Sequence, residues 1–126
     1  MDITGQWGLG LTHRDPIQFD LGEIQWSCDT MDFLNTITDD PIKFGTPLVL
    51  RHAQGDHGQW DEVPLRKSHN DEAKRKREGN VVSLYTVKGT DLFIITTFKE
   101  GTTLVMLSKE ARNIVDNKLT LDVEEF

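Results

Sequence analysis

The sequence has few of the features that cross-link a chain covalently or anchor it in a membrane. It contains one cysteine, Cys28, so no disulfide can form within the chain and a reducing, cytoplasmic environment is expected. Cys28 itself is expected to pack as an ordinary small residue. No apolar run approaches the roughly 20 residues of a membrane-spanning helix, and residues 1–5 lack the basic and apolar regions of a secretion signal. We therefore expect a cytoplasmic protein that does not insert into membranes.

The motifs of the best-marked enzyme classes are also missing. The sequence contains no glycine-rich phosphate loop, no nucleophile elbow of the Ser-His-Asp hydrolases and no closely spaced pair of cysteines for a metal. It has no internal repeat, heptad pattern or low-complexity tract. We therefore expect neither a cofactor nor a bound metal, and function has to be argued from weaker patterns.

What the chain does contain is enough for one globular domain. Its 126 residues are 37% hydrophobic and 28% charged, a balance typical of a folded domain that buries a single core. We expect one domain over residues 1–126, with residues 1–18 and 113–126 peripheral. The formal net charge is −7. A surplus of this sign repels phosphate backbones, which argues against general nucleic-acid binding.

The charge is unevenly distributed along the chain. Between positions 66 and 77 lie six basic residues: Arg66, Lys67, Lys74, Arg75, Lys76 and Arg77. Such a stretch can bind RNA, DNA or an acidic partner, and Arg75 and Arg77 are the candidates for contacting a phosphate. It can equally be a solvated helix face, because basic side chains near a helix C-terminus interact favourably with the helix dipole. Both interpretations stay open at this point.

The first two thirds of the chain predict a strand followed by short helices. Partial alternation favours a strand over residues 17–28 with a break at Gly22. Capping residues and helical spacing favour three helices, over residues 31–38, 48–53 and 68–78. The expected boundary signals are Asp29 or Thr30 as the first cap, residues 39–41 as a stop, Thr46-Pro47 and Ser68 as the next starts, and Gly79-Asn80 as the last stop. Residues 55–58 are expected to form a glycine-rich loop.

The clearest signal is an antiparallel meander. Three β-rich runs at residues 81–87, 92–98 and 102–107 are separated by two short polar connections. One face is expected to carry Val82, Leu84, Leu92, Ile94, Leu104 and Met106, and the other Phe93, Ile95, Val105 and Leu107. After Ser108, a helix over residues 109–117 and an edge strand over 119–123 are expected. The predicted fold is α+β, with short helices packed on a three- to five-stranded antiparallel sheet that contains this meander near its C-terminal end.

Several short motifs follow one another in a fixed order along residues 19–112. They are Phe19-Asp20-Leu21-Gly22-Glu23-Ile24, His52-x-x-Gly55-Asp56-x-Gly58, Asn70, Gly79, Ser83-x-Tyr85, Ile94-Ile95-Thr96 and Thr102-Thr103. In this order and spacing the chain resembles a small uncharacterised family of plasmid-related proteins, carried on plasmids and integrated elements of proteobacteria. The resemblance implies a mobile-element origin and brings no activity with it.

Two departures from the family pattern bear on chemistry. His57 stands where the family usually has a tryptophan after Gly-Asp, and residues 97–101 replace a turn that carries an arginine and a serine. If that arginine and that serine served a reaction, this chain has lost them.

His52, Asp56 and His57 form the best candidate constellation for chemistry. His52 and Asp56 are four residues apart and can meet across a helix end, where a carboxylate and an imidazole would make an acid–base pair. Two histidines and one aspartate can also ligate a metal, but no second cluster supports a metal site here. The structural alternative is that His52 and Asp56 hydrogen-bond a tight glycine loop, as aspartate often does in turns.

Polar residues in and near the predicted meander supply further candidates. On a sheet face they could surround a phosphate, with Arg51, Arg75 or Arg77 as the cation; the set is Asn70, Ser83, Tyr85, Thr96, Thr102 and Thr103. Helices followed by such a sheet resemble the barnase, colicin and RelE group of small metal-independent ribonucleases, in which Tyr85 and Thr103 would position the substrate. The alternative is that threonine is simply a good strand former. Likewise, Trp60 could stack on a base or be an ordinary core aromatic.

Three functions follow from these patterns. The first, which we favour, is a small plasmid or phage accessory protein that binds a host or element-encoded protein. Its concrete form is an anti-restriction or anti-CRISPR inhibitor, because an acidic surface can compete for a cationic DNA-binding cleft. The second is a small ribonuclease with His52 or His57 as the acid–base catalyst, which requires that its residues converge in one cleft. The third is a homodimer formed through the edge of the meander.

Overall fold

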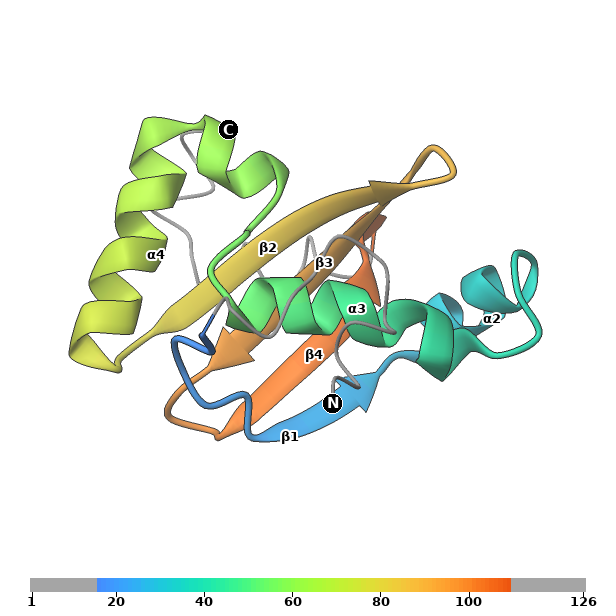
Figure 1. Ribbon diagram of the computed structural model, residues 1–126, viewed down its shortest axis with the longest axis horizontal. Coiled ribbons are helices and arrows are strands. Elements are labelled where there is room, and N and C mark those ends of the chain that lie inside the picture. Colours follow the sequence, from blue (N-terminus) through green and yellow to red (C-terminus); the bar gives the residue numbers. More distant parts are fainter. Residues whose placement is uncertain (1–15, 110–126) are drawn as a thin grey trace.

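The computed structural model describes residues 16–109, which form a four-stranded sheet with helices packed against it (Figure 1). In chain order the elements are β1 (Glu23–Trp26), α2 (Cys28–Asn35), α3 (Pro41–Ala53), the short 3-10 helix η1 (Gln59–Glu62), α4 (Pro64–Lys76), β2 (Asn80–Val87), β3 (Thr90–Thr97) and β4 (Thr102–Leu107). This arrangement confirms the expected α+β class. The helix expected over residues 109–117 extends beyond the described part of the chain, and the strand expected over 119–123 lies outside it.

The expected meander is confirmed, but the sheet is mixed. β2 pairs with β3 and β3 with β4, both antiparallel, and the strand order is β1-β4-β3-β2. β1 pairs in parallel with β4, from Glu23 opposite Thr102 to Trp26 opposite Val105. The parallel pairing is possible because a long connection separates β1 from β4. This connection contains the helices and the first two strands of the meander, so β4 can run beside β1 in the same direction. The strand expected over residues 17–28 is therefore confirmed only after its break at Gly22.

The predicted assignment of side chains to the two faces of the meander was wrong for β3. Val87 pairs with Thr90, and Thr97 pairs with Thr102, so each hairpin loop contains an even number of residues. Even positions of one strand therefore lie opposite odd positions of the next. One face carries Val82, Leu84, Phe93, Ile95, Leu104 and Met106, and the other carries Ser83, Tyr85, Leu92, Ile94, Thr96, Thr103, Val105 and Leu107.

Two clusters of helix residues cover the second of these faces. Val49 of α3 packs against Tyr85, Ile94 and Val105, and α3 crosses this face in Figure 1. Leu34 of α2 packs against Leu92 and Leu107. On the opposite face, Trp60 of η1 packs in a cluster with Val82, Leu84, Phe93, Ile95 and Met106. The core therefore lies on both sides of the meander, as its apolar strands require.

The helices begin earlier than the sequence signals indicated. α2 begins at Cys28 because Ser27, rather than Asp29 or Thr30, is its N-cap and accepts the Thr30 N–H at 3.1 Å. Residues 39–41 were expected to end the first helix, but α2 already ends at Asn35. Asp40 accepts the Lys43 N–H at 3.2 Å and so caps α3, whose first residue is Pro41.

Prolines explain the two remaining errors in the predicted starts. Pro47 lies inside α3 rather than at a helix start. α4 begins at Pro64 rather than Ser68, because proline suits the first helical position, where its missing N–H is not needed. α4 ends at Lys76, and Arg77 takes a left-handed conformation there (φ 57°). None of the helices within residues 16–109 combines the length and apolar character that crossing a bilayer requires.

Candidate functional site

A chain of polar side chains crosses the face of the sheet beneath α3. His52, in the last turn of α3, places Nδ1 2.6 Å from Ser83 Oγ of β2 and Nε2 2.8 Å from Thr96 Oγ1 of β3. Thr96 Oγ1 lies 2.6 Å from Thr103 Oγ1 of β4. The Thr103 hydroxyl donates to the Leu21 carbonyl at 2.6 Å. One imidazole thus connects three adjacent strands.

The same chain of contacts continues from Ser83 towards α4. His57 Nδ1 lies 2.7 Å from Ser83 Oγ, and Lys74 Nζ lies 3.0 Å from His57 Nε2. Lys74 also donates to Gln18 Oε1 at 2.9 Å. We call the connected set the histidine network; it consists of Lys74, His57, Ser83, His52, Thr96 and Thr103.

The backbone carbonyl of Leu21 determines the direction of the hydrogen bonds from Thr103 to His52. A carbonyl oxygen only accepts, so the Thr103 hydroxyl donates to Leu21 and is left to accept from Thr96. The Thr96 hydroxyl is then used as a donor, and its oxygen accepts from His52 Nε2. His52 therefore carries its proton on Nε2.

The directions of the remaining hydrogen bonds, from His52 to Lys74, follow when both imidazoles are neutral. His52 Nδ1 has no proton and accepts from the Ser83 hydroxyl, whose oxygen in turn accepts from His57 Nδ1. His57 Nε2 is then an acceptor, and it faces the ammonium group of Lys74, which has only donors. Every hydrogen bond of the network thus has one consistent direction, from Lys74 to Leu21.

The pKa values of the two histidines favour this neutral arrangement. Burial holds the pKa of His52 well below its usual value, and the neighbouring His57 and Lys74 act in the same direction. Burial also lowers the pKa of His57 to about 4, assisted by the charge of Lys74 and opposed by Asp56 and Asp71. Both imidazoles are accordingly neutral near pH 7.

The histidine network lies below the protein surface. His52, Ser83 and Thr103 are 0% exposed. The ring of Phe19, itself buried, lies edge-on to His52 with 5.1 Å between ring centroids. The expected catalytic residues His52, His57 and Thr103 are therefore brought together, as a ribonuclease requires, but no side of the network is open to a phosphodiester in this conformation.

Asp56 does not pair with His52, contrary to the acid–base interpretation. Its carboxylate binds Arg51 Nε at 2.9 Å and accepts the Gly58 N–H at 3.1 Å. Burial would raise the pKa of Asp56, but these two hydrogen bonds outweigh it and the pKa is lowered. α3 ends at Ala53, so the chain turns away before Asp56 can face His52. Asp56 instead holds the glycine loop, which is the structural alternative.

Tyr85 is tied to the same loop from the sheet. Its hydroxyl donates to the backbone carbonyl of Asp56, its ring lies 4.7 Å from the Arg51 guanidinium, and burial raises its pKa. Gly58 approaches β2 so closely that an added Cβ would lie 2.2 Å from the Leu84 carbonyl oxygen. A hollow of about 400 Å³ lies beside this contact, lined in part by Arg51, Asp56, Gln59, Tyr85 and Thr86.

Two of the predicted binding residues have structural positions. Trp60 is fully buried and packs edge-on against Phe93, with Arg66 above its ring at 4.9 Å, so it is a core aromatic and is not placed to stack on a base. Asn70 is also buried, and its side-chain amide bonds both backbone groups of Val82. Among residues 16–109, no group of three or more His, Cys, Asp or Glu side chains comes together as metal ligands would.

Two acidic residues of α4, Asp71 and Glu72, pair with part of the basic stretch, whose six basic and two acidic residues leave a net charge of +4 over residues 66–77. Glu72 lies 2.7 Å from both Arg75 and Lys76, and these hydrogen bonds lower its pKa to about 2. Asp71 lies 3.9 Å from Lys67 and from Lys74. The stretch is thus a solvated, partly ion-paired helix face with Arg77 at its exposed end.

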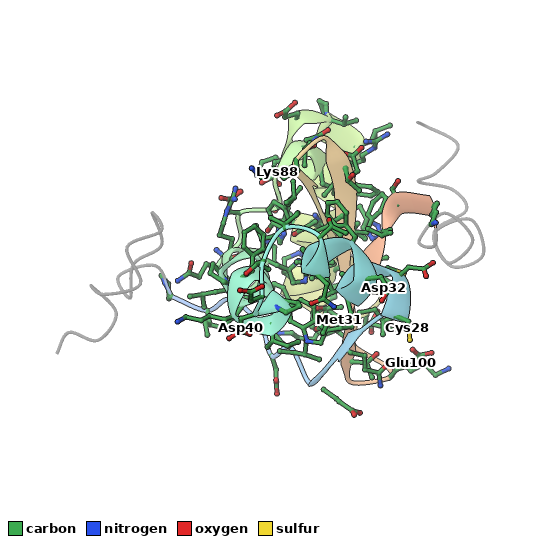
Figure 2. All side chains as sticks on the ribbon, turned by 90° about the vertical axis from the view of Figure 1, so that its right-hand side faces the viewer. Cys28, Met31, Asp32, Asp40, Lys88 and Glu100 are labelled. Carbon is green, nitrogen blue, oxygen red and sulfur yellow. The ribbon has the colours of Figure 1, made fainter. Side chains whose placement is uncertain are left out.

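Acidic residues are concentrated in the segment that contains β1 and α2. The register places Glu23 at the same end of the sheet as Asn80, whereas α2 packs near the opposite end, against Leu92 and Leu107. Residues 16–42 contain no Lys or Arg, and all six of their acidic residues are exposed: Asp20, Glu23, Asp29, Asp32, Asp39 and Asp40. None of these forms an ion pair in the described part of the chain. Figure 2 looks onto the side of the molecule where α2 lies, with Asp32 and Asp40 labelled and Lys88 above them. We call these six residues the acidic end, because they lie at the N-terminal end of the described residues.

Comparison with protein-family models, curated proteins and solved structures finds no significant match. The function of the chain is therefore argued from its own geometry.

Sequence reasoning named most of the network but not its connections. It missed Gln18 and Leu21, and it treated Lys74 only as one of a run of charges. A signal was present only at Ser83, which stands between Val82 and Leu84, because Thr96 and Thr103 each adjoin a second threonine. The common face of Ser83, Thr96 and Thr103 could be recognised only after the hairpin register was known.

Proposed function

We propose that this chain is a small accessory protein of a mobile element that acts by binding another protein, with its acidic end directed at a cationic surface. The observation that carries the proposal is the acidic end itself, six exposed carboxylates in a segment without Lys or Arg. Exposed apolar side chains accompany it: Ile24 and Ile42 lie within the segment, and Phe44 follows just after Lys43. Apolar contacts surrounded by complementary charge are typical of specific protein interfaces.

The concrete form of this proposal is an inhibitor of a host defence nuclease, of the anti-restriction or anti-CRISPR type. Such nucleases bind nucleic acid in cationic clefts, and a compact acidic protein competes for the same charges. The α4 basic stretch is partly ion-paired with Glu72 and Asp71, and in this proposal the cationic cleft contacts the acidic end rather than α4. The acidic end has six acidic residues and no Lys or Arg between residues 16 and 42, so its own segment offers no positive charge to pair with them.

A pull-down from nuclease-treated host lysate tests the proposal. The tagged wild type is expected to recover one stoichiometric protein, and the triple variant Asp29→Asn, Asp32→Asn, Asp39→Asn to bind it at least about tenfold more weakly. Asp40 is left unchanged because it caps α3. The matched control neutralises exposed acids elsewhere, Glu62→Gln with Glu78→Gln, and should bind like the wild type. Equal capture by both variants would contradict the proposal.

A ribonuclease is the second candidate, favoured by the convergence of His52, His57 and Thr103. It requires that Phe19 and Lys74 move aside to expose His57. Incubation of purified protein with labelled single-stranded RNA tests it directly. Cleavage by the wild type that is lost in His57→Ala would support an enzyme, and intact RNA with the wild type would remove this candidate.

A further inference from the structure

The two edges of the sheet differ in how their backbone groups are used. Along β2, the Val82 N–H donates to Asn70 Oδ1 at 2.9 Å, and the Val82 carbonyl accepts from Asn70 Nδ2 at 2.7 Å. The Leu84 N–H donates to the His57 carbonyl at 3.1 Å. At Val82 and Leu84 the outer edge of the meander is therefore occupied by groups of the same chain, which blocks pairing by another strand at these positions.

The other edge, along β1, has no strand paired to its outer side within residues 16–109, and we call it the open edge. Towards β4, the Glu23 N–H donates to the Gly101 carbonyl at 2.9 Å and the Ser27 N–H to the Val105 carbonyl at 3.0 Å. Because backbone groups alternate along a strand, those of Ile24 and Trp26 point away from β4. β1 is the last strand of the sheet order and the outermost in Figure 1, and no described residue pairs with it on this side.

The side chains along this edge define what an added strand would meet. Ile24 lies on the helix-covered face, opposite Thr103 in register, and is 39% exposed. α3 flanks that face closely, since a Cβ on Gly45 would lie 2.6 Å from the Trp26 ring, and the adjacent Phe44 is 37% exposed. Glu23 points to the opposite face. The edge thus offers an apolar surface on one side and an acidic residue on the other.

We propose that the open edge of β1 accepts an extended segment of the partner protein, which adds to the sheet as a fifth strand. Backbone hydrogen bonds to Ile24 and Trp26 provide the pairing, as in other cases of strand addition. The segment carries apolar side chains towards Ile24 and α3, alternating with Lys or Arg towards Glu23. This inference rests on the proposed function, because the acidic end selects a basic segment.

Charge also decides between a partner and a second copy of this chain. Two β1 edges brought together would oppose two acidic ends that contain no Lys or Arg. Like charges placed face to face disfavour that pairing. A basic extended segment meets no such repulsion, so the occupant is a different protein.

Amide hydrogen exchange of the wild-type protein with a synthetic peptide tests the inference. The probe is an end-capped hexapeptide of alternating Lys and Val, and the control peptide alternates Glu and Val. The Lys-Val peptide is expected to slow exchange at the Ile24 and Trp26 amides and to leave Val82 and Leu84 unchanged, whereas the Glu-Val peptide changes neither pair. Binding of both peptides alike, or of neither at millimolar concentration, would overturn the inference.

A proline substitution provides the second test. Ile24→Pro removes an N–H that points away from β4, so the bonds between β1 and β4 are retained and the fold is expected to survive. Its affinity for the Lys-Val peptide should fall at least about tenfold, while Ile24→Val should bind like the wild type. If Ile24→Pro bound the Lys-Val peptide as tightly as the wild type, the proposed strand addition would be contradicted. The proposed function would still stand if the lysate partner depended on Asp29, Asp32 and Asp39.

Discussion

At the scale of single residues, one hydroxyl organises the buried polar groups. Ser83 accepts from His57 and donates to His52, and it has no contact with solvent. A serine suits this position because one oxygen supplies a donor and an acceptor within a small volume. Without it, one nitrogen of each buried imidazole would lack a hydrogen-bond partner.

Substitution of Ser83 by alanine is expected to be strongly destabilising. Each buried polar group left unpaired costs about 1–3 kcal/mol, so Ser83→Ala should lower the free energy of unfolding by about 3 kcal/mol. Urea unfolding followed by circular dichroism measures the change. Thr86→Ala, at an exposed position of the same strand, is the matched control and should lose less than about 1 kcal/mol. Equal losses in the two variants would show that the network contributes little.

At the scale of elements, α4 protects the sheet as well as covering it. Its Asn70 side chain occupies the backbone groups of Val82 that an exposed edge strand would present to other chains. The next outward-facing amide of β2, that of Leu84, donates to the carbonyl of His57 in the loop before η1. The closed edge and the open edge of the sheet are therefore set by which elements lie beside them.

Asn70→Ala is expected to open the protected edge. The Val82 N–H and carbonyl lose their partners, so the variant should be about 2 kcal/mol less stable. Its Val82 amide should also exchange faster, and light scattering should show more self-association than for the wild type. Ser68→Ala, at an exposed position of α4, should leave all three measurements unchanged. A monomeric Asn70→Ala protein with a protected Val82 amide would contradict this role.

At the scale of the whole molecule, stability is linked to proton binding. Unfolding returns His52 and His57 to water, where an imidazole has a pKa of about 6.5. In the folded protein both pKa values are depressed, so the unfolded chain binds more protons in acid. The stability that neutral histidines provide is fully present above pH 6.5 or so and is lost as the pH falls towards the folded values.

We therefore expect the free energy of unfolding to decrease between about pH 6.5 and pH 4. A shift of His57 from about 6.5 to about 4 corresponds to about 3 kcal/mol, and His52 adds to it in the same direction. Urea unfolding at several pH values measures the slope. His57→Gln should be less stable at pH 8 but have a shallower slope, whereas an unchanged slope would mean that His57 does not cause it. The pKa values of Asp56 and Glu72 are also lowered, and the stability that these carboxylates contribute is lost from the lower part of this window downwards.

Features that depend on neighbours in sequence could be predicted from the sequence. The three strands of the meander follow from local β-rich runs and the polar turns between them, and the acidic and basic segments are simply counts of charge. The Gly55–Gly58 loop held by Asp56 was likewise a local possibility. The starts of the helices were harder to predict from the sequence. Pro41, Pro47 and Pro64 are all compatible with a helix start, but only Pro41 and Pro64 begin helices.

Tertiary structure decided everything that depends on register and on distant contacts. The hairpin register placed Ser83, Thr96 and Thr103 on one face, and the packing of α3 and α4 brought His52 and Lys74 to them. The pairing of β1 with β4 placed β1 at the edge of the sheet, where none of the residues from 16 to 109 pairs with its outer side. Sequence patterns fix conformation over a few residues through backbone sterics and burial periodicity. Which side chains meet across the sheet depends on how the strands align, and no single segment encodes that alignment.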